Sequence, residues 1–206
     1  MIDRFCDFIM KKIKENLENV DEEKELVINF GVRLIFGELP KILILFIIGF
    51  ILGIGPYTLI LFLLLAPYRS FTGGFHLKTH LGCMITTSIL YLVPILLAKY
   101  IDISQSYILY IMVTLVGILS TFIISKYAPA DTENIPILSK KERKSKKIKA
   151  YVSLVILLII IALSPNQIIS WMLIYGIILQ NLTVIPIAYK LTNTKHGYEV
   201  YTEETV

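Results

Sequence analysis

Long apolar runs separated by short charged segments constrain the fold of this chain more than any other feature. A helix needs about 20 residues to cross the hydrocarbon core of a bilayer. Of the 206 residues, 55% are hydrophobic and 17% are charged, whereas a soluble domain has about 25% charged residues. The mean hydropathy is +0.70. We therefore predict an all-α integral membrane protein.

Several apolar blocks are candidates for transmembrane helices. Three of them reach the required length, and the others are shorter or contain ionisable residues; the blocks are 26–54, 56–68, 81–98, 106–125, 150–163 and 168–189. Glu38 and Lys41 interrupt the first block, and because they lie three residues apart on a helix they could form an ion pair. We predict about six transmembrane helices, of which the second is the shortest.

The segment 1–25 is predicted to form an amphipathic interfacial helix rather than a signal peptide. Charged residues occur throughout it, and no apolar core with a small-residue cleavage site is present. Apolar residues recur at helical spacing between the charges, at Ile2, Phe5, Cys6, Ile9, Ile13 and Leu17. This pattern is typical of a helix on the inner surface of a membrane. Cys6 belongs to the apolar stripe, so we interpret it as structural.

The basic residues orient the bundle, because cytoplasmic segments retain Lys and Arg. They concentrate in the segments 1–25, 69–80, 126–149 and 190–206. The loops on the opposite side contain a single basic residue, Lys99. Both termini are therefore predicted in the cytoplasm of the cell, as is the segment 69–83. The predicted parts are an N-terminal helix (1–25), a membrane domain (26–189) with a basic cytoplasmic loop (126–149), and a cytoplasmic tail (190–206).

The segment 69–83, "RSFTGGFHLKTHLGC", interrupts the apolar pattern. Irregular backbone at membrane depth persists only where protein shields it or where it lines a wet cavity. Gly73 and Gly74 disfavour continuation of a helix, and they allow the backbone to pass close to a ligand. We therefore expect this segment to enter a pocket at the cytoplasmic interface.

Cys83 and His76 are the candidate reactive pair of this segment. A free thiol with a pKa of about 8.5 is only a few per cent ionised at neutral pH, and a nearby imidazole can accept its proton. On one continuous helix, residues seven apart are separated by about 10 Å along the axis. A working pair therefore requires His76 in a loop and Cys83 in the first turn of the next helix, where the helix dipole favours a thiolate.

Three other interpretations are open at this point. His76 and His80 could be interfacial polar residues, with Cys83 packed against a neighbouring helix. Alternatively, His76, His80 and Cys83 could lie on one face of an unbroken helix and bind a metal ion in a membrane hydrolase. The metal site needs a continuous helix, whereas the thiol pair needs a bent chain. A peptide transporter or exporter is the third alternative, although such proteins pair broken helices across repeats.

The spacing of this segment resembles the signature of a known family. Arg69, Gly74, His76 and Cys83 match R-x4-G-x-H-x6-C, the pattern of the accessory gene regulator B (AgrB) family. A second block, "YAPADTENIPI" at 127–137, resembles another stretch of that family and is likewise followed by a basic run. The order of the blocks is similar over nearly the whole chain.

The resemblance implies a membrane cysteine endopeptidase of a Gram-positive bacterium. Members of the family cleave a short precursor peptide, AgrD, and support its cyclisation to a quorum-sensing autoinducing peptide. Cys83 would be the nucleophile that forms a thioester, and His76 would be its general base. Arg69, Gly73 and Gly74 would support the site. The resemblance also implies a homodimer, and we expect no cofactor, metal ion or nucleic acid.

Two features near the second block have alternative interpretations. The basic run 140–149 either contacts anionic lipid of the inner leaflet or, as the family implies, docks the acidic tail of the precursor. Its candidate docking residues are Lys140, Lys141, Arg143, Lys144, Lys146 and Lys147. Asp131 either orients His76 or caps a turn, which is the more ordinary role of an aspartate.

Overall fold

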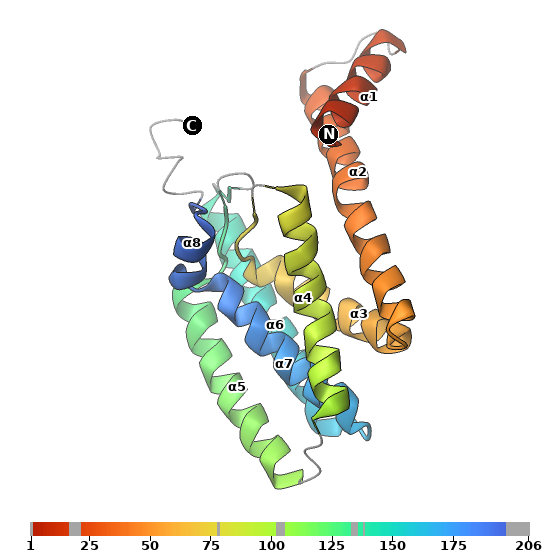
Figure 1. Ribbon diagram of the computed structural model, residues 1–206. Helices are drawn as coiled ribbons and strands as arrows, with labels where there is room; N and C mark the ends of the chain where they lie inside the picture. The colour runs from red at the N-terminus through yellow and green to blue at the C-terminus, as the bar shows by residue number, and fades with distance from the viewer. Residues whose placement is uncertain are drawn as a thin grey trace.

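The computed structural model describes residues 2–16, 22–77, 79–101, 106–132, 136–137 and 139–196. This part of the chain forms eight helices and no strand (Figure 1). The helices are α1 (Ile2–Asn16), α2 (Glu22–Ile51), α3 (Gly55–Thr72), α4 (His80–Tyr100), α5 (Ser106–Tyr127), α6 (Lys140–Leu163), α7 (Gln167–Val184) and α8 (Pro186–Thr192). The predicted all-α class is confirmed for these residues.

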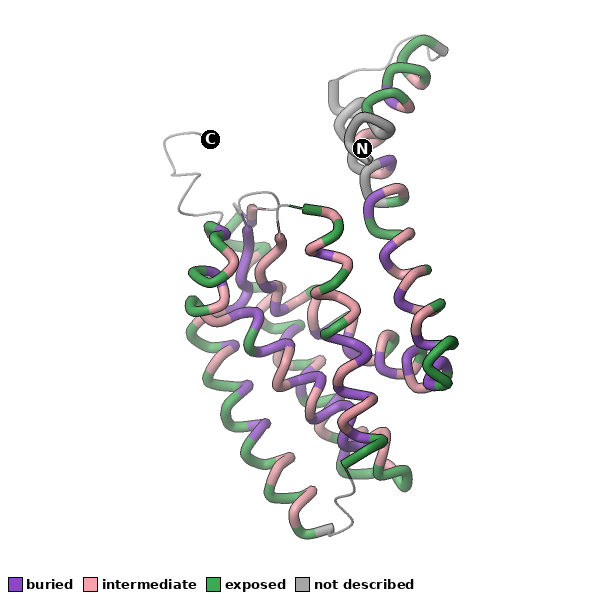
Figure 2. Tube along the Cα trace, in the orientation of Figure 1, coloured by how far each residue is buried: buried purple, intermediate pink, exposed green. Residues whose placement is uncertain are grey.

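Helix α7 occupies the centre of the bundle. It packs against α3, α4, α5 and α6, and buried residues run along its length (Figure 2). In its apolar window 61% of the residues are buried, against 17% in the window of α5, which lies at the periphery. The apolar core around α7 includes Trp171, Met172 and Ile174. Two polar residues of the same helix, Gln180 and Asn181, are also buried.

Helices α1 and α2 form an arm beside the main bundle (Figure 1). The turn at 52–54 joins α2 to α3, and Gly53 has a φ of +67° there. The arm contacts the bundle where α2 packs against α3 and α4. Helix α1 packs on α2 through a small cluster around Met10 and Val32. The side chain of Cys6, interpreted as structural, lies outside the described residues.

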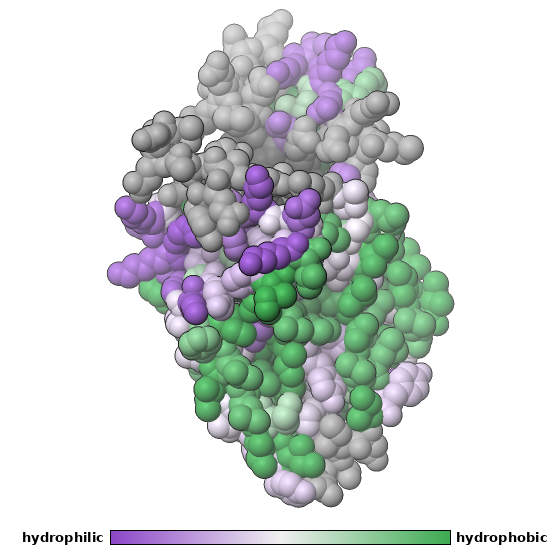
Figure 3. All heavy atoms as spheres, turned by 60° about the vertical axis from the view of Figure 1, so that its left-hand side comes forward, coloured by the Kyte–Doolittle hydropathy of each residue, from purple (hydrophilic) through white to green (hydrophobic). Residues whose placement is uncertain are grey.

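The outer surface of the bundle is largely apolar. Exposed hydrophobic side chains include Leu63, Ile118, Leu119, Ile156 and Leu163. Figure 3 shows one such surface, with hydrophilic residues gathered toward one end of it. Soluble monomers rarely expose contiguous apolar patches of more than a few hundred Å². Among the described residues, α4, α5 and α7 are long and apolar enough to cross a membrane, so the fold fits a membrane protein.

Two boundaries differ from the sequence predictions. The basic run 140–149 forms the first turns of α6 instead of belonging to a loop, because the Ser139 hydroxyl caps this helix by accepting a main-chain N–H of the first turn at 3.4 Å. The last apolar block, predicted as one helix over 168–189, divides at Ile185 into α7 and α8. The division occurs there because a residue before a proline, here Pro186, disfavours the helical conformation.

Candidate active site

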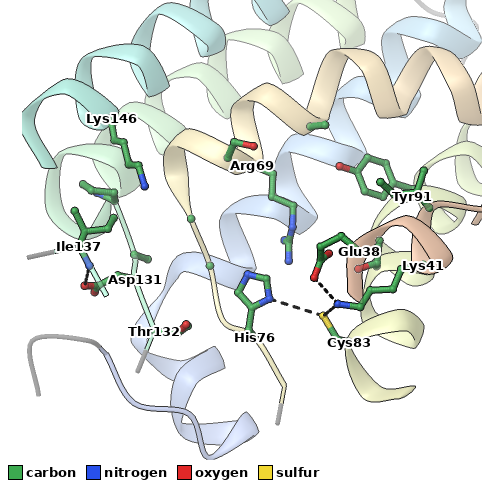
Figure 4. Close-up of a pocket in the computed structure, with 18 of the residues that line it drawn as sticks. Glu38, Lys41, Arg69, His76, Cys83, Tyr91, Asp131, Thr132, Ile137 and Lys146 are labelled. Atoms are coloured by element: carbon green, nitrogen blue, oxygen red, sulfur yellow. Dashed lines mark hydrogen bonds and ion pairs between the residues drawn. The ribbon is translucent and has the colours of Figure 1, made fainter. Parts of the chain in front are cut away.

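A cavity of about 320 Å³ lies where α2, α3 and α4 meet the segments that follow α3 and α5. Its walls include Glu38 and Lys41 from α2, Arg69 from α3, His76 from the segment before α4, Cys83 from α4, and Asp131 and Thr132 from the segment after α5 (Figure 4). Both sequence motifs therefore contribute to one site.

The chain turns between His76 and Cys83, as a thiol–imidazole pair requires. Helix α4 begins at His80, where the Thr79 hydroxyl accepts a hydrogen bond from the Gly82 amide at 3.1 Å. Cys83 lies in the first turn of this helix, and His76 lies in the non-helical segment before it. The distance from His76 Nδ1 to Cys83 Sγ is 3.8 Å (Figure 4). This geometric prediction is confirmed.

The helix geometry required for the alternative metal site is not present. His76, His80 and Cys83 could share one face only on a continuous helix, but α4 starts at His80. Within the described ranges, no group of three His, Cys, Asp or Glu side chains is arranged to hold a metal ion. The local backbone therefore favours the thiol pair.

Gly73 and Gly74 bring the two sequence motifs into contact. Gly73 has a φ of +73°, and a Cβ there would overlap the carbonyl group of Ala130. The Gly74 amide donates to that carbonyl at 2.9 Å, and the Ala130 amide donates to the last carbonyl of α3 at 2.9 Å. A Cβ on Gly74 would overlap the side chain of Thr183. This pairing fixes the segment that carries His76, and only glycine fits both positions.

His76 is held in its uncharged form. Burial lowers the pKa of His76 to about 4, and the positive charge of Arg69 acts in the same direction. Lys41 lowers this pKa further, while Glu38 has the opposite effect. An imidazole with this pKa is neutral at pH 7. It can accept a proton from Cys83 when the nitrogen that faces the sulfur, Nδ1, carries the lone pair.

Gln180 of α7 connects Arg69 to the end of α3. Its Oε1 accepts a hydrogen bond from Arg69 Nη1 at 2.8 Å. Its Nε2 donates to the Gly73 carbonyl at 2.7 Å and to the Thr72 hydroxyl at 2.9 Å. Gln180 is not among the residues predicted from the sequence. The available signal was a polar residue within the apolar block 168–189, since polar side chains at membrane depth are usually functional.

Lys41 has one contact that was predicted from the sequence and one that was not. Its Nζ forms the expected ion pair with Glu38 Oε1, at 2.6 Å. The same Nζ lies 3.6 Å from Cys83 Sγ. Lys41 and Cys83 are each 8% exposed, so little water reaches the contact. The two residues are 42 positions apart in the chain, and only the packing of α2 against α4 brings them together.

Asp131 connects the segment after α5 to the start of α6. Its Oδ2 accepts hydrogen bonds from the Ile137 amide at 3.0 Å and from Arg143 Nη2 at 2.5 Å. No hydrogen bond joins it to His76 in the part of the chain that the structure describes. Its Oδ1 and the Thr132 hydroxyl are buried in the cavity wall without a partner among the described residues.

The basic residues considered for docking divide between the site and the surface. Arg143 reaches the site through its ion pair with Asp131. Lys146 lines the cavity and forms an ion pair with Glu142 at 3.1 Å. Lys147 donates to a carbonyl of α5 at 2.5 Å. The exposed members of the proposed docking set are Lys140, Lys141 and Lys144.

Comparisons with known proteins extend over most of the chain. The accessory gene regulator protein B of Staphylococcus intermedius is 29% identical over 91% of this chain and 95% of its own. The protein of the same name from a Staphylococcus aureus strain is 28% identical over 91% of this chain and 94% of its own. An AgrB-like protein of Clostridium acetobutylicum is 24% identical over 100% of this chain and 96% of its own. No solved structure matches.

The family model described as accessory gene regulator B matches residues 6–184. This range includes every residue of the cavity described above. The chain therefore belongs to the accessory gene regulator B family.

Proposed function

We propose that this protein is a membrane cysteine endopeptidase that cleaves an AgrD-like precursor peptide and supports its cyclisation to a quorum-sensing autoinducing peptide. The observation that carries the proposal is the 3.8 Å approach of His76 Nδ1 to Cys83 Sγ at the wall of a cavity. A thiol beside an imidazole base is suited to nucleophilic attack on a peptide carbonyl. Membership of the AgrB family supports the assignment of substrate.

Cleavage begins when the Cys83 thiol transfers its proton to His76 Nδ1. The thiolate attacks the scissile carbonyl, and His76 then donates the proton to the departing amine of the C-terminal fragment. The product is a thioester between Cys83 and the N-terminal fragment. The lowered pKa of His76 favours the second transfer, because an imidazolium in this environment is a stronger acid than usual.

Cyclisation uses the energy of the thioester. A thiol or hydroxyl within the bound fragment attacks it, closes a thiolactone or lactone, and returns a proton to the Cys83 sulfur. Hydrolysis competes with this step, so the site must exclude water. The low exposure of Cys83, 8%, is consistent with this requirement.

Buried polar atoms in the cavity wall offer contacts to a peptide. Asp131 Oδ1 and Thr132 Oγ1 have no partner among the described residues, and such an atom costs about 1–3 kcal/mol when it stays unsatisfied. The main-chain amides of an extended precursor would satisfy them. Gly73 and Gly74 support the site by fixing the segment of His76, and Arg69 does so through its positive charge.

We further propose a topology with six transmembrane helices and both termini in the cytoplasm. Helices α2, α3 and α6 have 30, 18 and 24 residues. At 1.5 Å per residue the shortest is about 27 Å long, close to the thickness of the hydrocarbon core. In this arrangement α1 lies at the inner leaflet of the cell membrane, and the exposed lysines of α6 face anionic lipid and the acidic tail of the precursor. The homologues in Staphylococcus and Clostridium support a Gram-positive host, and a homodimer is expected for the family.

Co-expression with an AgrD-like precursor tests the proposed activity, with the peptide products identified by intact mass. The wild-type protein should yield the cleaved, cyclic product. Cys83→Ala and His76→Ala should leave the precursor uncut while both variants insert in the membrane normally. Cys6→Ser is the matched control and should retain cleavage. Cleavage by Cys83→Ala would contradict the proposal, and loss of activity with a chelator but not with an alkylating agent would favour a metal-dependent hydrolase.

A further inference from the structure

The sulfur of Cys83 has a cationic neighbour in addition to the imidazole. Lys41 Nζ donates a hydrogen bond to Cys83 Sγ at 3.6 Å, which is slightly shorter than the 3.8 Å between the sulfur and His76 Nδ1. Figure 4 shows the lysine reaching toward the sulfur from α2, whereas His76 comes from the segment before α4. The reactive atom therefore has both a base and a cation as neighbours.

His76 does not provide a counterion for the sulfur in the resting site. With its pKa lowered to about 4, the imidazole is uncharged at neutral pH. A neutral imidazole can take up a proton, but it does not offset the charge of a buried thiolate. Because a buried charge is costly unless it is paired, a thiolate that persists before substrate binds needs another positive group.

Charged and titratable groups line the part of the cavity around Cys83 in the described chain. They are Glu38 and Lys41 on α2, Arg69 on α3, His76 before α4, and Tyr91 on α4 itself. Arg69 is hydrogen-bonded to the neutral amide of Gln180. The two cations of this group therefore exceed its single carboxylate, and one negative charge on Cys83 would balance it.

The remaining charges of the cavity are already balanced by pairs. Asp131 pairs with Arg143 at 2.5 Å, and Lys146 pairs with Glu142 at 3.1 Å. The uncompensated positive charge therefore belongs to the group around Cys83. Of the two cations in that group, Lys41 is the one that contacts the sulfur among the described residues.

We infer that Lys41 is a further catalytic residue, whose ammonium group stabilises the thiolate of Cys83, and that Glu38 limits this stabilisation. The inference rests on the proposed function, in which Cys83 is the nucleophile. It assigns a role to the α2 arm, since the arm brings the ammonium group of Lys41 to an active site otherwise built from α3, α4 and the two motif segments.

Lys41 acts only as a hydrogen-bond donor when Cys83 ionises, and no bond of Lys41 is made or broken. The proton leaves the sulfur for His76 Nδ1 or for water, and one N–H of the ammonium donates to the resulting thiolate. The carboxylate of Glu38 accepts a hydrogen bond from the Lys41 ammonium group at 2.6 Å. The same carboxylate repels the thiolate and competes for the ammonium. Removing Lys41 and removing Glu38 should therefore change the thiolate population in opposite directions.

Alkylation of Cys83 by iodoacetamide measures this population without any substrate. The full chain is reconstituted in lipid nanodiscs in a Cys6→Ser background, and the rate is followed by intact mass as a function of pH. Lys41→Met should slow alkylation about tenfold at neutral pH, which equals a shift of about one unit in its pH midpoint. Lys41→Arg should retain most of the rate, and Glu38→Gln should increase it several-fold.

Lys99→Met is the matched control, because Lys99 is exposed in the last turn of the same helix as Cys83. It should not change the alkylation profile. A thermal unfolding scan of each variant identifies any loss of folding. If Lys41→Met does not fold, Glu38→Gln decides the question: faster alkylation supports the inference, and an unchanged or slower rate overturns it.

Failure of this inference can be told apart from failure of the proposed function. If folded Lys41→Met is alkylated like the wild type while Cys83→Ala cannot cleave precursor, Cys83 is the nucleophile but Lys41 does not stabilise its thiolate. If Cys83→Ala still cleaves precursor, the proposed function fails whatever the alkylation rates are. A purely structural Lys41 would lower thermal stability without changing the pH midpoint of alkylation.

Discussion

The surroundings of His76 determine the pH range over which the proposed active site can work. The His76 ring is partly buried beside Cys83, and this burial is the largest of the causes that lower its pKa to about 4. Arg69 and Lys41 add to this effect, and Glu38 opposes it. The proposed base therefore stays unprotonated over a wider range of acidic pH than an exposed histidine, whose pKa is about 6.5.

The pH dependence of single-turnover cleavage should reflect this environment. A base must be unprotonated, so a lowered pKa keeps His76 active as the pH falls, and the acidic limb should have its midpoint near 4. Arg69→Gln should move this midpoint upward and Glu38→Gln should move it downward, because they remove charges of opposite sign. Arg69→Gln should not restore an ordinary midpoint, because burial remains. A wild-type midpoint near 6.5 would rule out a buried His76 as the base.

The sequence predicted the residues of the reactive pair but not all of their neighbours. Cys83 and His76 could be identified because their motif is local and because Gly73 and Gly74, just before His76, disfavour continuation of the preceding helix. Lys41 and Gln180 could not be linked to the site in this way, because their contacts depend on how α2 and α7 pack against distant parts of the chain. Spacing within one segment carries no information about such contacts.

At the scale of the elements, the junction between α3 and α4 depends on close backbone pairing. Gly73 approaches Ala130 so closely that a Cβ would overlap its carbonyl group. This contact joins the segment after α3 to the segment after α5, which is how the two motifs form one wall of the cavity.

Gly73→Ala adds two effects: the strain of an alanine at positive φ, and the overlap of its Cβ with the Ala130 carbonyl. The substitution should therefore disrupt the site more than the strain alone would do. Gly53→Ala is the matched control, since Gly53 has a similar φ of +67° but no atom within 4 Å of an added Cβ. The control should cost about 1–3 kcal/mol in stability and retain cleavage, whereas Gly73→Ala should lower cleavage at least about tenfold. Precursor cleavage and thermal unfolding in nanodiscs measure the difference. Equal effects of the two substitutions would contradict the importance of the pairing.

Element positions were predictable where apolar periodicity was uninterrupted. The apolar blocks located α4 and α5 closely. The basic start of α6 was assigned to a loop, because composition shows that Lys140–Lys149 is polar but not that Ser139 caps a helix there. The break before Pro186 was missed because the apolar run continues through it.

On the whole molecule, positive charge gathers at the end of the bundle that holds the proposed active site. Arg143 and Lys146 connect the start of α6 to the cavity. Exposed lysines lie near them on the same helix, at positions 140, 141 and 144. An acidic peptide tail guided by this surface would deliver the preceding segment of the precursor to Cys83.

Neutralising the exposed lysines should weaken binding more than chemistry. The triple substitution Lys140→Gln, Lys141→Gln and Lys144→Gln should raise the apparent KM for precursor about tenfold and change the single-turnover rate at saturation less than about twofold. The control is the double substitution Lys190→Gln and Lys195→Gln. It removes two exposed charges in and just after α8, outside the proposed docking set. A fall in the saturated rate with an unchanged KM would argue against docking.

The central claim is that Cys83 forms a thioester with the N-terminal fragment of the precursor. Intact-mass analysis of the protein after acid quench of a single turnover tests it most directly. The account predicts an adduct with the mass of that fragment, located on Cys83, removed by hydroxylamine and absent from Cys83→Ala. Efficient cleavage by the wild-type protein with no adduct at any reaction time, together with cleavage by Cys83→Ala, would contradict it.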